Sequence, residues 1–225
     1  MKVKIYQIDK NLDKNNLLFE RYEFMEKEIG KIDSSIYKTV YDGNIEASNL
    51  EEIYSICNTN HPVGYNGHSL SVSDVVELED GSCYYCDSFG FKKLDDFDIS
   101  ATKSIVGYKM LVIEPHKMPY AMVIPDGLAP LQQAVKGYIE ASFPFDDNAY
   151  IICNEEGKLI GLEANRVFGN DVYVGNILIV ADDGEGGTTD LTDEQIAKYT
   201  EIFKNLEIDT DIKNDICFFE IMDDD

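Results

Sequence analysis

The residues best suited to chemistry lie in residues 61–74, where HPVGYNGHSLSVSD combines two histidines, three serines and an aspartate. His68 and Asp74 could polarise a serine hydroxyl, which suggests nucleophilic catalysis. His68 and its neighbour Ser69 would point to opposite faces of a strand, and no nucleophile-elbow pattern surrounds the serine. We therefore interpret the segment as a turn and strand with hydroxyl-to-backbone hydrogen bonds, and we assign no catalytic residue.

A second chemical motif is the pair Cys83-x-x-Cys86, a spacing typical of zinc ligands. Cys57, His61 and His68 are the other candidate ligands, but a zinc ribbon needs a second cysteine pair, which the sequence lacks. We expect these cysteines to be reduced thiols buried as small apolar groups, with no metal and no cofactor.

Carboxylates of the second half form the third candidate group. The glycine-rich stretch 183–187 lacks the Lys-Ser/Thr of a phosphate-binding loop, and no EF-hand pattern occurs. Each acidic pair also fits an ordinary solvated turn. We select seven of these carboxylates as candidate binding residues for a partner protein: Asp146, Asp147, Glu155, Glu156, Asp182, Asp183 and Glu185.

The charge of the chain narrows the choice of partner. The 225 residues include 43 Asp and Glu against 19 Lys and Arg, a formal net charge of −24. Residues 1–105 carry 19 acidic and 11 basic residues, and residues 106–225 carry 24 and 8. Such a surface repels phosphates and attracts basic clefts, so we expect no direct nucleic-acid binding. The acidity also fits a simpler role in solubility, and the acidic end 223–225 is expected to be solvated.

Hydrophobic periodicity predicts an α+β fold of two small modules, each a mainly antiparallel sheet with one or two packed helices. The expected modules span residues 1–94 and 107–225, and a linker spans residues 95–106. Ser48 and Thr192 are predicted helix N-caps. Strands are expected at 2–8, 35–41, 72–78, 82–89, 108–113, 120–124, 150–153, 158–162 and 176–181, and helices at 17–28, from 48, 128–139 and 192–206.

Nothing at the start resembles a secretory signal, and no apolar run is long enough to span a membrane. We therefore expect a cytoplasmic protein without a membrane partner.

Two longer motif sets carry a family resemblance. The GHSLSVSD core at residues 67–74 and YYCDSFGF at residues 84–91 resemble the YodL-like domain over about residues 1–100. Residues 110–115, 131–140 and 153–161 resemble a second, uncharacterised family of Firmicutes phages and conjugative elements, over about residues 108–210. Neither resemblance brings a catalytic residue set. Together they imply accessory cargo of a mobile genetic element.

Our leading hypothesis is a non-enzymatic accessory protein that inhibits a host nucleic-acid-handling defence protein, of anti-CRISPR or anti-restriction type. Its acidic surface would imitate nucleic acid and enter a basic cleft. The alternative is a small-molecule or nucleotide-signal binder, with an apolar pocket lined by Tyr84, Tyr85, Phe89 and Phe91. A hydrolase using a histidine, His68 or His116, is the third hypothesis. Salt separates the first two, since mimicry fades with ionic strength and apolar binding does not.

Overall fold

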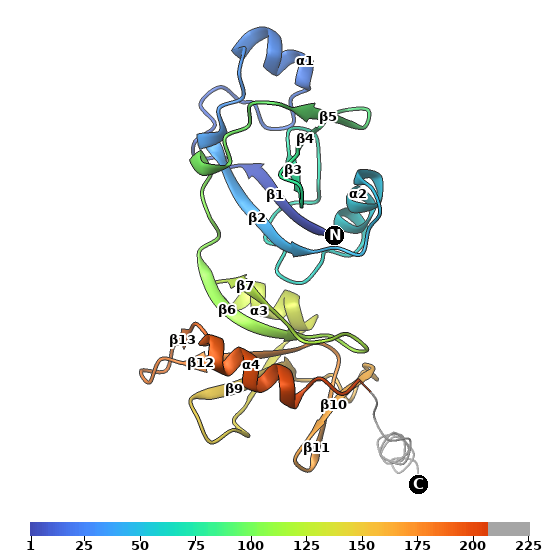
Figure 1. Cartoon of the computed structure of the whole chain (residues 1–225), viewed down its shortest axis with the longest axis vertical. Helices are drawn as coiled ribbons and strands as arrows, with labels where there is room; N and C mark the ends of the chain where they lie inside the picture. Colours follow the sequence, from blue (N-terminus) through green and yellow to red (C-terminus); the bar gives the residue numbers. More distant parts are fainter. Residues whose placement is uncertain (207–225) are drawn as a thin grey trace. The chain divides into compact units, whose positions relative to one another are not determined.

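The computed structural model describes residues 1–206, and the chain divides into two compact units, Met1–Val106 and Gly107–Asp225 (Figure 1). Each unit contains an antiparallel sheet with a few helices, which confirms the predicted α+β class. The acidic end at residues 223–225, expected to be solvated, lies outside the described residues. None of the helices within residues 1–206 has the length and apolar character needed to cross a bilayer.

The first unit contains a five-stranded sheet in which every neighbouring pair is antiparallel, in the order β2-β1-β3-β4-β5. Its strands are β1 (Lys2–Ile8), β2 (Tyr37–Asn44), β3 (Val75–Leu78), β4 (Cys83–Cys86) and β5 (Phe91–Leu94). Its helices are α1 (Tyr22–Phe24), which continues into a π-helical turn at Met25–Ile29, and α2 (Leu50–Thr59), with 3₁₀ turns at Ser34–Ile36 and Ile99–Ala101. One core cluster joins the sheet to the segment before β2 and includes Tyr6, Leu17, Met25 and Tyr85.

Three local predictions for this unit were wrong. The helix expected at 17–28 starts only at Tyr22, because Asp13 accepts hydrogen bonds from the backbone of residues 17 and 18, and Phe19 adopts a φ of +70°. The N-cap of α2 is Asn49, whose side chain accepts from the Glu52 backbone, and not Ser48. Residues 69–74 form a loop and not a strand, since Ser73 has a φ of +78°.

Residues 95–106, expected to be a linker, pack against the first unit as far as Lys103. The Phe97 ring lies 5.5 Å from that of Tyr6 and 5.3 Å from that of Tyr37, measured between centroids. The backbone of Thr39 on β2 donates to the Lys103 carbonyl at 2.8 Å. This segment therefore covers part of the edge of β2.

The second unit contains a six-stranded sheet in the order β7-β6-β12-β9-β8, with β13 paired to β12, and a separate hairpin of β10 and β11. The strands are β6 (Gly107–Ile113), β7 (Tyr120–Pro125), β8 (Ile139–Ser142), β9 (Ala149–Asn154), β10 (Ala164–Phe168), β11 (Asp171–Val174), β12 (Ile177–Asp182) and β13 (Thr188–Thr189). The helices are α3 (Leu128–Val135) and α4 (Asp193–Ile202). The predicted Thr192 cap of α4 is confirmed, with a complete capping box to Gln195.

Two predictions for this unit were wrong. α3 ends at Val135 and not near residue 139, because Lys136 is left-handed and the Asn154 amide donates to the Val135 and Lys136 carbonyls. Residues 158–162 form turns and not a strand, and β9 pairs with β8 and β12 instead, while the next two strands, β10 and β11, pair with each other.

A buried arginine holds the end of α4 in place. Arg166 is 3% exposed and donates from Nε to the Phe203 carbonyl at 2.8 Å, at the C-terminal end of the helix. Its Nη1 donates to the Asn165 carbonyl at 2.8 Å, and its Nη2 donates to the Lys117 carbonyl at 2.6 Å. A cation at this helix end also complements the helix dipole.

Candidate functional site

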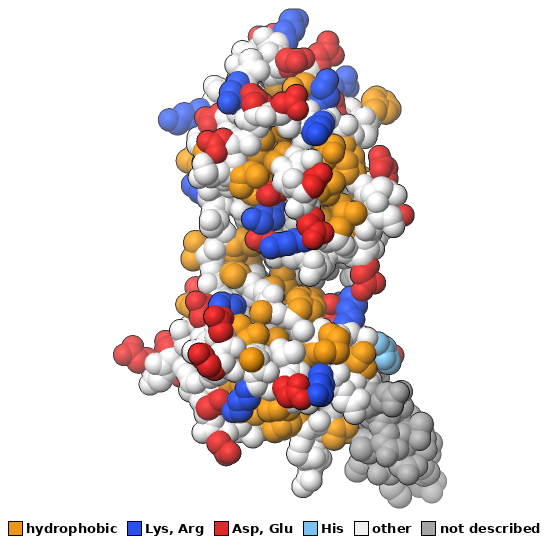
Figure 2. All heavy atoms as spheres, in the orientation of Figure 1, with side chains coloured by type: hydrophobic (Ala, Val, Ile, Leu, Met, Phe, Trp, Pro, Cys, Tyr) orange, Lys and Arg blue, Asp and Glu red, His pale blue; other side chains and the backbone are white. Residues whose placement is uncertain are grey.

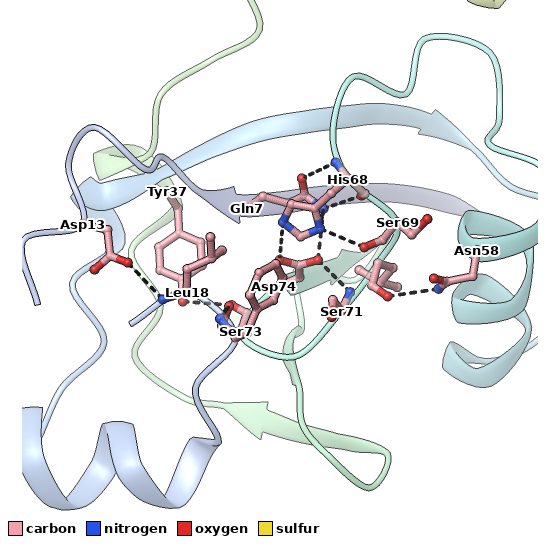
Figure 3. A network of polar contacts seen from close by, with 12 residues as sticks. Gln7, Asp13, Leu18, Tyr37, Asn58, His68, Ser69, Ser71, Ser73 and Asp74 are labelled. Atoms are coloured by element: carbon pink, nitrogen blue, oxygen red, sulfur yellow. Dashed lines mark hydrogen bonds and ion pairs between the residues drawn. The ribbon is translucent and has the colours of Figure 1, made fainter. Parts of the chain in front are cut away.

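The GHSLSVSD segment folds as a loop, and Gln7 of β1 makes several hydrogen bonds to it (Figure 3). Gln7 is 1% exposed, and its Nε2 donates to the His68 carbonyl at 2.8 Å and to Asp74 Oδ2 at 3.0 Å. Its Oε1 accepts from the His68 backbone N–H at 3.1 Å. The loop therefore depends on a side chain about sixty positions earlier in the chain, which a strand pattern alone does not reveal.

Asp74 lies at the centre of this network and is fully buried. Its Oδ2 accepts hydrogen bonds from Gln7 and from the Ser71 backbone, the latter at 2.8 Å. Within residues 1–206, its Oδ1 has no hydrogen-bond partner and lies 3.7 Å from His68 Nε2. Burial raises the pKa of Asp74 well above its usual value, although the bonds from Ser71 and Gln7 act in the opposite direction.

The two ring nitrogens of His68 both face the protein itself. Nδ1 lies 2.8 Å from the Ser69 carbonyl, a geometry in which Nδ1–H donates. Nε2 is buried opposite Asp74 Oδ1. Their contact is favourable when either the imidazole nitrogen or the carboxyl oxygen carries a proton. The hydroxyl of Ser69 pairs instead with His61 Nε2 at 3.3 Å. The ring nitrogens of His68 thus contact Asp74 and the Ser69 carbonyl, and the Ser69 hydroxyl contacts His61.

The cysteines of Cys83-x-x-Cys86 lie on β4, and both are buried. Burial raises the pKa of Cys83 to about 11 and that of Cys86 to about 12, so neither is a thiolate at neutral pH. Cys57 is buried as well. In the part of the chain that the structure describes, no cluster of three or more His, Cys, Asp or Glu residues has a geometry suited to a metal ion.

A pocket of about 290 Å³ lies between α2 and the turn that joins β4 to β5. Only one of the four aromatic residues expected to form a pocket, Phe91, lines it. Tyr85 is a core residue whose hydroxyl donates to the Glu20 carbonyl at 2.7 Å, and Phe89 is 97% exposed at the turn. Tyr84 is half-buried on β4. The four rings therefore do not form one apolar pocket.

In the second unit, Asp147 is tied to α4. It accepts from the Tyr199 hydroxyl at 2.5 Å, from Lys198 Nζ at 2.9 Å and from the Ala149 backbone at 3.1 Å. Burial by itself would raise the pKa of Asp147, but the bonds from Tyr199 and Lys198 outweigh it and lower the pKa to about 2. Asp147 is therefore charged and bound to α4, although it is exposed, as is Asp146 beside it.

The last residue of β12, Asp182, and the loop after it carry the next three candidates. Asp183 Oδ1 accepts from the backbones of Glu185 and Gly187 at 2.7 and 2.9 Å, which lowers the pKa of Asp183. Asp182 Oδ1 accepts from the Gly184 backbone at 2.5 Å. Asp183 and Glu185 are exposed, and Figure 2 shows acidic side chains on this loop between β12 and β13.

Asn148 brings these two acidic segments together. The Asp182 backbone donates to the Asn148 carbonyl at 2.8 Å, and the Asn148 amide donates to the Asp182 carbonyl at 2.7 Å. Five of the seven candidates therefore lie at one end of the sheet, the acidic end: Asp146, Asp147, Asp182, Asp183 and Glu185.

The other two candidates lie elsewhere. β9 pairs antiparallel with β12, with Ala149 opposite Ala181 at the acidic end. Glu155 and Glu156 follow β9 at its far end, about 17 Å along a strand of this length, and both are exposed. The seven carboxylates therefore do not form a single surface.

These elements define a two-domain protein in which both domains have an α+β fold. Residues 2–97 match the family model of the YodL-like domain, and residues 108–204 match that of a domain of unknown function, DUF3846. The chain is therefore a YodL-like domain followed by a DUF3846 domain, which confirms the resemblance found in its motifs. No curated protein and no solved structure matches the chain.

Proposed function

We propose that this protein is a non-enzymatic accessory protein of a mobile genetic element, such as a phage, and that it acts in the cytoplasm. It binds a host nucleic-acid-handling defence protein, of anti-CRISPR or anti-restriction type, and inhibits it. The acidic end of the second unit occupies the basic cleft in which that host protein would hold nucleic acid. The partner is a protein, and the chain binds neither nucleic acid nor a membrane directly.

The observation that supports this proposal is the grouping of carboxylates at the acidic end. Asn148 joins two segments that are more than thirty positions apart and carry five acidic side chains. The backbone hydrogen bonds to Asp183 and the contacts of Asp147 with α4 restrain those carboxylates. A restrained group of charges loses less conformational entropy on binding than a flexible one.

The electrostatics favour fast and salt-sensitive association. The lowered pKa values of Asp147 and Asp183 keep both groups ionised in mildly acidic solution. The second unit also has the larger negative charge, with 24 acidic and 8 basic residues after position 105. Opposite charge on a partner steers encounter, and added salt screens it over roughly 10 Å at 0.1 M ionic strength.

The test is capture of partners from host lysate by the tagged full chain at low and high salt, with mass spectrometry of the bound fraction. Two matched double variants follow, Asp183→Asn with Glu185→Gln at the acidic end and Glu155→Gln with Glu156→Gln at the far end. Each removes two charges, and the amide introduced by Asp183→Asn retains an oxygen that can accept the two backbone hydrogen bonds.

The proposal predicts that a nucleic-acid enzyme is captured at low salt, and that the acidic-end variant weakens its binding and inhibition at least tenfold. The far-end variant should change binding less than twofold. Equal weakening by both variants would mean that only net charge matters, and it would contradict the assignment of a site. Failure to enrich any nucleic-acid enzyme would contradict the proposal as a whole.

A second candidate function, small-molecule binding, is favoured by the pocket of about 290 Å³ in the first unit. Its lining includes Glu51 and Asp87 and no basic residue. Such a lining repels phosphate, so a nucleotide signal is a poor ligand for it. Small-molecule binding there should survive the charge changes at the acidic end.

A further inference from the structure

From the same pocket we infer a second interaction site, independent of the acidic end: it receives an arginine side chain from an apolar segment of a partner protein. The pocket is lined by Glu51, Tyr54, Val72, Cys86, Asp87 and Phe91 among others. Two carboxylates and two aromatic rings, with no lysine, arginine or histidine in the lining, are the chemistry that recognises a cation. A planar guanidinium can stack on a ring and pair with a carboxylate at the same time.

Both carboxylates have capacity to bind a ligand. Glu51 is exposed on the first turn of α2. Asp87 Oδ1 accepts from the Ser88 backbone at 2.7 Å and weakly from the Tyr22 backbone at 3.4 Å, and these bonds orient the carboxylate. Within residues 1–206 its Oδ2 has no hydrogen-bond partner in the structure. An incoming guanidinium would supply donors to that oxygen.

The nearest lysine in the sequence does not fill the pocket. Lys92 follows Phe91 on β5, and its Nζ lies over the Tyr22 ring, 5.0 Å from the ring centroid. Tyr22 does not line the pocket, and its ring lies edge-on to that of Tyr85 at 5.4 Å. Neither Lys92 nor Lys93, the two lysines of β5, lines the pocket.

Phe89 indicates that the ligand is part of a protein and not a small amine. It is 97% exposed at the turn between β4 and β5. The turn itself is well defined, since Asp87 N–H donates to the Gly90 carbonyl at 3.0 Å and Gly90 adopts a φ of +72°. A phenylalanine held in water by an ordered turn gains free energy when a partner covers it. A partner segment that places arginine in the pocket has an apolar neighbour within reach of this ring.

The experiment is a ¹H–¹⁵N NMR titration of the full chain with a capped tetrapeptide, acetyl-Leu-Arg-Leu-Gly-amide. The control peptide carries citrulline, which keeps the shape of arginine without its charge. The inference predicts shifts at α2 and at the β4–β5 turn, with at least fivefold weaker binding of the citrulline peptide. Glu51→Gln and Asp87→Asn should each weaken arginine-peptide binding about threefold, as expected for an exposed ion pair.

Three further variants make the test specific. Phe89→Ser should weaken binding about threefold without affecting the fold, because the ring is exposed. Glu79→Gln, at the turn between β3 and β4, removes one exposed charge away from the pocket and should leave binding unchanged. The acidic-end variant with Asp183→Asn and Glu185→Gln should also leave it unchanged, so failure here is distinguishable from failure of the proposed function.

Equal binding of the two peptides, or shifts confined to the second unit, would overturn the inference. Full binding by Phe89→Ser, or binding of free arginine as tight as that of the peptide, would overturn the assignment to a protein segment.

Discussion

His68 Nε2 and Asp74 Oδ1 face each other at 3.7 Å, and within residues 1–206 neither atom has a hydrogen-bond partner. Asp74 is fully buried, and the His68 ring lies against Phe19 with 5.2 Å between centroids. A bare carboxylate and a bare nitrogen would repel each other in this position, so a proton on one of them stabilises the loop. We therefore expect the stability of the GHSLSVSD loop to depend on pH and on the side-chain amide of Gln7, which hydrogen-bonds to Asp74 and to the His68 backbone.

Asp74→Asn should change how stability depends on pH. The pKa of Asp74 is raised by folding, so its contribution is fully present below about pH 3.8 and is lost as pH rises through the folded pKa. We expect the unfolding free energy of the wild type, relative to the variant, to fall as the pH rises above about 4. Each unit of difference between the folded and unfolded pKa corresponds to about 1.4 kcal/mol. Urea denaturation at several pH values measures this, and a pH-independent difference would contradict it.

Gln7→Ala should destabilise the first unit by about 2–4 kcal/mol, because it leaves the His68 backbone and Asp74 without their shared partner in a buried site. Lys10→Ala, at an exposed position after β1, is the control and should have little effect. Denaturation monitored through the NMR peaks of the first unit distinguishes local unfolding of the loop from unfolding of the whole unit. A stability like that of the control would show that the glutamine does not hold the loop.

Arg166→Lys should destabilise the second unit by about 2–4 kcal/mol although the charge is kept. The planar guanidinium of arginine donates to three separate carbonyls, those of Phe203, Asn165 and Lys117. The single ammonium of a lysine cannot reach all three at once. Lys204→Met, at an exposed position, is the control. Hydrogen exchange at α4 should increase in the arginine variant, and unchanged protection of α4 would contradict the role as a helix-end clamp.

Asp147→Asn should lower stability by about 1 kcal/mol at pH 7, through weaker bonds to Tyr199 and Lys198. The pKa of Asp147 is lowered by folding, so its contribution is present above about pH 3.8 and is lost as pH falls towards about 2. The variant and the wild type should therefore converge in acid.

Asp146→Asn is the matched control for this prediction, and it should cost little at either pH because Asp146 is exposed. Thermal unfolding of all three proteins at pH 3 and pH 7 measures the difference. A larger loss for Asp147→Asn at pH 3 than at pH 7 would reverse the expected sign and exclude the ionised carboxylate as the stabilising species.

Prediction from sequence worked best where local pattern and tertiary packing agree. The buried strand at Ile177–Asp182 is a continuous apolar run as far as Ala181, and the Thr192–Gln195 capping box places both of its partners within one helical turn. It failed at residues 69–74, where apolar and serine residues alternate as in a strand but Asp74 accepts from Ser71 and Gln7 instead. Hydrogen bonds from the side chain of a distant residue outweighed the local preference.

For the candidate acidic residues too, the sequence predicted some features and the tertiary structure decided others. Sequence reasoning identified the seven carboxylates by type, and the tertiary structure separated Glu155 and Glu156 from the other five. It also showed that Asp147 is partly structural, because Tyr199 and Lys198 of α4 reach it across fifty positions. The hydrogen bonds between Asn148 and Asp182 could not be predicted from the sequence, because an asparagine in an acidic loop also fits a solvated turn.

By itself the sequence determined the α+β class, the two families and the strong negative charge, because these follow from composition, periodicity and long motifs. Only the tertiary structure decided which polar groups meet: Gln7 with His68 and Asp74, Arg166 with the end of α4, and Asn148 with Asp182. The physical reason is that each of these contacts joins residues more than thirty positions apart. Their geometry depends on sheet register and on which groups are buried together, and neither is encoded in a local pattern.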